Sequence, residues 1–253
     1  MSRVAADILI RAIKRKPDSV LGLATGSTPK GVYRELVRRF DDGEVDFSAV
    51  TTFNLDEYLG LPPDDARSYH HFMRKELFRH VNVPEDKIHI PDGTVTSGFA
   101  RSCDEYEQAI RRAGGIDIQL LGIGKQGHIG FNEPTSSLGS RTRVKTLTRE
   151  TREANRPFFS SHEVSPDCAI TMGIGTILEA RRILLLASGL GKAEAVERAV
   201  EGPISSSCSA SALQMHGSVT VILDEDAASR LKQIDYYRRV METTARLTPE
   251  RLL

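Results

Sequence analysis

The chain has 253 residues, of which 40% are hydrophobic and 27% charged, a composition typical of a globular protein. Its 34 Lys and Arg residues balance 34 Asp and Glu residues, so the formal net charge is zero. With no basic excess and no zinc-finger spacing, nothing indicates a nucleic-acid partner. The longest apolar runs are strand-sized, which argues against a membrane span, and the charged N-terminal stretch does not fit a signal peptide.

Three widely spaced cysteines, Cys103, Cys168 and Cys208, predict neither a disulfide framework nor a zinc site. An odd number of cysteines without metal-ligand spacing suits a reducing compartment. We therefore expect a cytoplasmic protein.

Short apolar runs alternate along the chain with amphipathic stretches of helical period. This alternation is typical of a Rossmann-like, three-layer α/β fold, in which helices cover both faces of a mostly parallel open sheet. No repeat, low-complexity tract or linker interrupts it, so residues 1–253 are expected to form a single domain. The predicted strands are 19–24, 50–55, 116–124, 144–148, 168–174, 182–188 and 218–224. The predicted helices are about 29–40, 69–80, 99–113 and 191–200.

Polar residues follow four of these strands, where the crevice of an open α/β sheet binds its ligands. After the first strand, "LATGSTPKG" places Gly26, Ser27 and Thr28 ahead of a helix, with Thr28 as the expected N-cap. Such a helix start can bind a phosphate, although an ordinary strand-to-helix turn explains the same residues. After the strand 182–188, Lys192 can place an ammonium group on a phosphate, or it is a surface lysine.

After the second strand, "FNLDEYLGLP" puts Asp56 where an acid can face the crevice. Asp56 is a candidate general base because of this position. The alternative is a solvated carboxylate in a loop, which is the more common role of an isolated Asp-Glu pair.

The strand 116–124 leads into "GIGKQGHIGFNEP", which contains a literal G-x-G-x-x-G. A dinucleotide site needs a helix that starts within the glycines and an acid about 20 residues further on. Here turn residues follow the glycines and no acid lies at that distance, so the dinucleotide hypothesis fails. His128 and, five residues later, Glu133 form a candidate acid/base pair on this loop.

Together these segments resemble the glucosamine-6-phosphate deaminase (isomerising) family. The matching stretches run in the family's order from about residue 20 to 223, and "NLDEYLGL" with "GHIGFNEP" is highly specific. The resemblance implies conversion of glucosamine 6-phosphate to fructose 6-phosphate and ammonia without a cofactor or metal.

Matched residue by residue, the resemblance implies that Asp56 takes the proton from C2 of the open-chain sugar and returns it at C1 through an enolamine. His128, oriented by Glu133, would move the proton between the ring oxygen and the anomeric hydroxyl during ring opening. The phosphate would lie on Gly26, Ser27, Thr28 and Lys192. A segment at about 145–170 is expected to act as a lid.

Three departures from the family pattern stand out. Gln126 occupies a position where many relatives carry an aspartate beside the histidine. Arg156 is displaced by one position from the family's phosphate-binding arginine, and Pro157 takes that slot. The chain also begins inside a predicted helix, without the strand that the family resemblance predicts before it.

In allosteric members of the family the N-terminus helps to bind the activator N-acetylglucosamine 6-phosphate. Because the N-terminus is short here, we expect no such activation, although Ser136, Arg143 and Lys145 resemble parts of the family's allosteric site. A misassigned start codon is the alternative explanation for the short N-terminus.

Two other functions stay open. A 6-phosphogluconolactonase-like hydrolase would share the fold but has no use for a base at C2. A non-catalytic sugar-phosphate sensor would normally carry a DNA-binding helix-turn-helix ahead of the domain.

The neighbouring His70 and His71 show no third ligand at metal spacing. The oligomeric state is open, since relatives occur as monomers and as homo-oligomers.

Overall fold

The protein is seen in a computed structural model that describes residues 1–156 and 166–247. Its main element is a parallel sheet of six strands, and every neighbouring pair in it runs in the same direction. The predicted mostly parallel fold is therefore confirmed. Across the sheet, the strands are β4 (Ile88–His89), β2 (Thr51–Asn54), β1 (Val20–Leu23), β5 (Ile118–Gly122), β8 (Arg182–Ala187) and β9 (Val219–Leu223).

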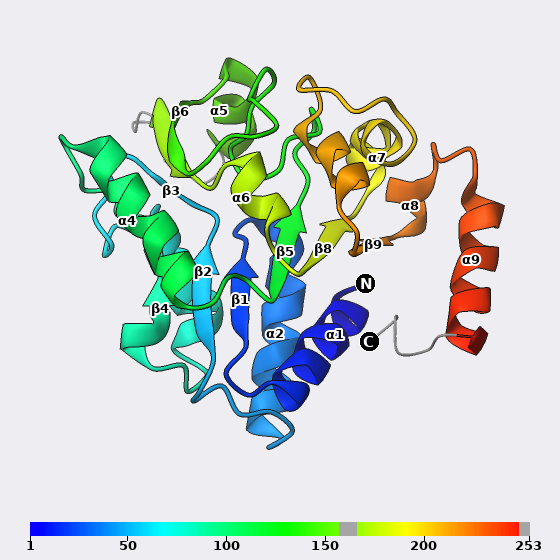
Figure 1. Cartoon of the computed structure of the whole chain (residues 1–253), viewed down its shortest axis with the longest axis horizontal. Helices are drawn as coiled ribbons and strands as arrows, with labels where there is room; N and C mark the ends of the chain where they lie inside the picture. The colour runs from blue at the N-terminus through cyan, green and yellow to red at the C-terminus, as the bar shows by residue number, and fades with distance from the viewer. Residues whose placement is uncertain (157–165, 248–253) are drawn as a thin grey trace.

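Helices cover both faces of this sheet (Figure 1). The α-helices are α1 (Ser2–Arg15), α2 (Ser27–Asp41), α3 (Tyr69–Met73), α4 (Phe99–Arg112), α5 (Arg149–Asn155), α6 (Ile174–Leu178), α7 (Ala193–Val200), α8 (Glu225–Ala228) and α9 (Ile234–Leu247). Short π or 3₁₀ turns are η1 (Arg74–Phe78), η2 (Glu85–Lys87), η4 (Leu190–Lys192) and η5 (Ser209–Met215).

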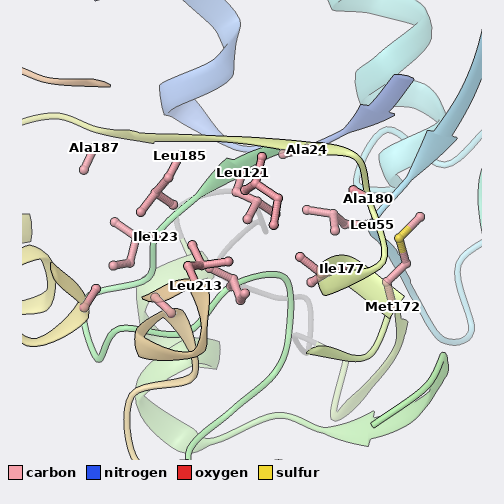
Figure 2. Close-up of a cluster of buried hydrophobic side chains, with 14 of the residues drawn as sticks. Ala24, Leu55, Leu121, Ile123, Met172, Ile177, Ala180, Leu185, Ala187 and Leu213 are labelled. Atoms are coloured by element: carbon pink, nitrogen blue, oxygen red, sulfur yellow. The ribbon is translucent and has the colours of Figure 1, made fainter. Parts of the chain in front are cut away.

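The core is divided by the sheet, because successive strand residues point to opposite faces. In β8, Leu184 and Leu186 pack with α1 and α2, whereas Ile183 and Leu185 pack with residues of α4, α6 and α7. Figure 2 shows part of the cluster that contains Ile183 and Leu185, in which Leu121 lies between Ala24 and Leu185. All of these side chains are buried. Strands that are apolar on both faces are typical of a parallel sheet covered by helices.

A second, antiparallel sheet of three strands was not expected. It has the order β3 (Asp56–Tyr58), β7 (Cys168–Thr171) and β6 (Arg143–Thr146). Strands were predicted near β6 and β7, but residues 56–58 were predicted as a loop, which is wrong. An Asp-Glu-Tyr run carries no strand pattern, and its pairing partner lies more than a hundred residues away.

The carboxyl ends of β2, β1, β5 and β8 are neighbours at one edge of the main sheet. Beyond that edge lie β6 and α5 (Figure 1). The four segments singled out in the sequence therefore meet in one place.

Candidate active site

A cavity of about 400 Å³ lies at the carboxyl edge of the sheet, and all four strand ends contribute to it. Gly26 follows β1, Asp56 follows β2, His128 follows β5 and Lys192 follows β8, and each of the four lines the cavity. The structure therefore brings the four strand ends together around one cavity.

The loop after β1 presents the start of helix α2 to the cavity. Gly26 has a φ angle of 101°, a backbone conformation that favours glycine, and α2 begins at the next residue. The predicted N-cap at Thr28 is therefore wrong: Gly26 is the N-cap, and Ser27, Thr28 and Pro29 form the first turn. All four residues line the cavity, so the positive end of the helix dipole and its free N–H groups are available to an anion.

Lys192 lies at the N-cap of α7 and lines the same cavity as this helix start. Its Nζ donates a hydrogen bond of 2.6 Å to the carbonyl oxygen of Ile123. Burial, together with the nearby charge of Lys125, lowers the pKa of Lys192. An ammonium group has three donors, so the bond to Ile123 leaves capacity for an anionic ligand.

Asp56 is the first residue of β3 and is 5% exposed, so the alternative of a solvated loop carboxylate does not hold. Burial raises the pKa of Asp56 to about 8, and the charge of Glu57 adds to the shift. The carboxylate lies close to the loop after β5: its Oδ2 is 3.3 Å from the point that a Cβ on Gly130 would occupy. Glycine at position 130 therefore keeps space for the acid.

His128 and Glu133 lie together as predicted, with Nδ1 of the histidine 3.5 Å from Oε2 of the glutamate. Neither atom has a hydrogen-bond partner among the described residues. Burial lowers the pKa of His128, and the charge of Glu133 opposes this shift. The imidazole packs so tightly on Gly124 that a Cβ there would lie 2.1 Å from Nε2. Glu133 is 1% exposed, and its Oε1 accepts a bond of 3.1 Å from the N–H of Thr148.

Residues 1–222 match the family model described as glucosamine-6-phosphate isomerases/6-phosphogluconolactonase. The chain belongs to this family. It is 56% identical over 247 residues to a glucosamine-6-phosphate deaminase from Hahella chejuensis, covering 98% of this chain and 94% of the relative.

Two solved structures extend this comparison. A monomeric glucosamine-6-phosphate deaminase is 50% identical and has a TM-score of 0.88, covering 90% of this chain and 95% of the other. A 6-phosphogluconolactonase from Leishmania guyanensis is 26% identical and has a TM-score of 0.72, covering 91% of this chain and 94% of the other. Both branches of the family therefore share the fold.

Gln126 and Arg156, which depart from the family pattern, are not among the described residues that line the cavity. Gln126 is half-buried, and its Oε1 has no partner among the described residues. Arg156 is exposed at the C-cap of α5, directly after Asn155, which does line the cavity. Pro157 and part of the expected lid at 145–170 fall within residues 157–165, outside the described residues.

Two of the residues compared with the family's allosteric site, Ser136 and Arg143, lie in the loop after β5 or contact it. Nη1 of Arg143 donates a hydrogen bond of 2.9 Å to Oδ1 of Asn132, and Ser136 is buried. Lys145 lies on β6 and is half-buried. None of the three is among the described residues that line the cavity.

Sequence reasoning missed several cavity residues. Tyr69 at the start of α3 lines the cavity, and its ring stacks on Phe131 with centroids 6.0 Å apart. Thr151 and Asn155 of α5 also line it. Lys125 lines the cavity too, and its place in the glycine-rich loop is a local signal that could have predicted it. No local signal distinguishes Tyr69, Thr151 or Asn155.

Within residues 1–156 and 166–247, no three His, Cys, Asp or Glu side chains come together as a metal site. None of the helices in those ranges has the length and apolar character needed to cross a membrane. His70 contacts Glu57 rather than His71.

Proposed function

We propose that this protein converts glucosamine 6-phosphate and water to fructose 6-phosphate and ammonia. The observation that carries the proposal is that one cavity contains a buried carboxylate, Asp56, and a histidine, His128, together with a helix N-terminus and Lys192. This set combines a base, a proton shuttle and a phosphate site. The deaminases to which the chain is similar support the same reaction.

Substrate binding in this proposal starts with the phosphate. The phosphate would be bound by the first-turn N–H groups of α2, the hydroxyls of Ser27 and Thr28 and the ammonium group of Lys192, since all of these residues line the cavity. A dianion held at two points fixes the sugar, so binding energy far from the reacting carbons positions C1 and C2.

Ring opening falls to His128. Its imidazole accepts the proton of the anomeric hydroxyl and delivers a proton to the ring oxygen, which yields the open-chain aldehyde. Glu133 is a positioning residue here, because it lies behind the imidazole and stabilises the imidazolium by charge.

Isomerisation falls to Asp56. Its carboxylate takes the proton from C2 while the substrate's ammonium group gives a proton to the C1 carbonyl oxygen, which forms an enolamine, and the proton held by Asp56 then returns to C1. The resulting C2 imine then takes up water and releases ammonia, which leaves the C2 ketone of fructose 6-phosphate. A carboxylate with a pKa raised to about 8 is a stronger base than an ordinary carboxylate. The positively charged amino group of the substrate favours the ionised form of Asp56.

Two proposals, on Arg156 and Gln126, remain from the family resemblance. Arg156 would reach the phosphate after a movement of the end of α5 toward the cavity, since Asn155 already faces it. Gln126 would support ring opening from the loop that carries His128.

One assay separates this function from its rivals. We expect incubation with glucosamine 6-phosphate to yield ammonia and fructose 6-phosphate in equal amounts. A 6-phosphogluconolactonase would instead open 6-phosphogluconolactone and leave the amino sugar untouched. Saturable binding of glucosamine 6-phosphate without ammonia release would favour a sensor and refute the proposed reaction.

A further inference from the structure

Glu57, the neighbour of the base Asp56, is fully buried and its carboxylate accepts several hydrogen bonds. Oε1 accepts bonds from the backbone N–H groups of Tyr58 at 2.8 Å and Tyr69 at 2.9 Å. Oε2 accepts a bond from the backbone N–H of His70 at 3.0 Å and lies 3.0 Å from Nδ1 of the same residue. Both carboxylate oxygens are thus used within the protein.

These bonds join two walls of the cavity. Asp56 and Glu57 are successive residues of β3, so their side chains leave opposite faces of the strand. Glu57 reaches the first turn of α3, whose residue Tyr69 lines the cavity. The site is closely packed, because a Cβ on Gly93 would lie 3.0 Å from Cγ of Glu57. One carboxylate therefore holds the strand of the base against the helix that forms the cavity wall.

The charge of Glu57 also raises the pKa of Asp56, because a neighbouring carboxylate in a buried setting disfavours the ionised form of Asp56. Other titratable groups that interact with Asp56 are the phenols of Tyr58, Tyr69 and Tyr106. His128 and Lys192 line the same cavity from the other strand ends, and His70 contacts Glu57 from α3.

We propose that Glu57 is a positioning residue for the reaction: its buried carboxylate locks β3 to α3 and sets both the orientation and the basicity of Asp56. The inference rests on the proposed function. Glu107 provides a matched control, because it is another buried glutamate whose carboxylate accepts several hydrogen bonds. Its donors are Thr142, Thr176 and Arg141, and it is not among the described residues that line the cavity.

The test compares Glu57→Gln with Glu107→Gln. In Glu57→Gln the charge is lost, so we expect the pH midpoint for the base limb of kcat/KM to fall by about 1 unit. We expect kcat to fall about 10-fold, because the base is weaker and an amide N–H₂ meets the N–H donors of α3, while KM changes less than about 2-fold. In Glu107→Gln, stability falls but the midpoint stays. An equal midpoint in the two variants would overturn the inference.

Two further measurements keep the inference separable from folding and from the proposed reaction. Glu57→Asp keeps the charge but shortens the reach, so kcat should fall without a fall in the midpoint; an unchanged kcat counts against the lock. The carboxyl carbon of Asp56 can be titrated by NMR without substrate, and its midpoint should fall in Glu57→Gln. If the parent released no ammonia, the proposed function would fail, yet this titration would still decide the role of Glu57.

Discussion

Glu133 lies behind His128, with Oε2 3.5 Å from Nδ1, so the imidazole is placed between a buried carboxylate and the cavity. The charge of Glu133 works against the burial that lowers the pKa of His128. In Glu133→Gln this opposing charge is lost, so we expect the pKa of His128 to fall further and kcat to fall by about 100-fold. A pH–rate profile of the variant checks both. Glu153→Gln, an exposed residue paired with Arg149, is the control and should match the parent.

Gln126 offers the reverse experiment on the same histidine. A carboxylate in place of the half-buried amide would favour the imidazolium, so Gln126→Asp should move the limb of the pH–rate profile assigned to His128 to higher pH. The variant should stay active, because Glu133 keeps its place. An unchanged profile would discard a role for position 126 in ring opening.

Asp56 is expected to couple activity to stability. Its pKa of about 8 lies far above the ordinary value of about 4 for an aspartate. Between these two pH values the carboxyl group of Asp56 is protonated in the folded protein and ionised in the unfolded chain. Stability from this group is present at low pH and is lost as the pH rises from about 4 to 8.

The variant Asp56→Asn should therefore lose ammonia release and yet unfold less easily than the parent. We expect a gain of about 3 kcal/mol in the free energy of unfolding at pH 9 and a smaller gain at pH 4. Urea unfolding at both values checks this. A variant that releases ammonia at the parental rate would remove Asp56 from the mechanism.

Gly124 is expected to be indispensable because of its neighbour. A methyl group there would meet the imidazole of His128 at 2.1 Å and displace it from the cavity. Gly124→Ala should reduce kcat by about 100-fold, since a displaced proton shuttle forfeits its catalytic contribution. Gly139→Ala, at a position where nothing lies within 4 Å of an added Cβ, should retain parental kinetics.

Lys192 and Lys87 form a matched pair, because each donates to a backbone carbonyl but only Lys192 lines the cavity. Lys192→Met should raise KM by about 10-fold or more, as expected for a lost hydrogen bond to a charged ligand, and should weaken inhibition by inorganic phosphate. Lys87→Met should leave both quantities unchanged. Equal KM values in the two variants would exclude Lys192 from the phosphate site.

Local sequence determined the alternation of strands and helices and the four polar strand ends. The sequence alone could assign Gly26, Asp56, His128 and Lys192 to one site, because the carboxyl ends of neighbouring parallel strands meet at one edge of a sheet. Periodicity and turn residues are local signals, and they suffice for that step.

The tertiary structure decided what surrounds those residues. The pairing of β3 with β7 turns Asp56 from an apparent loop residue into a buried carboxyl group, and the approach of α3 brings Tyr69 to the cavity and N–H groups to Glu57. These contacts join residues distant in the chain. Burial, and the pKa shift that follows from it, depends on neighbours that no local pattern specifies.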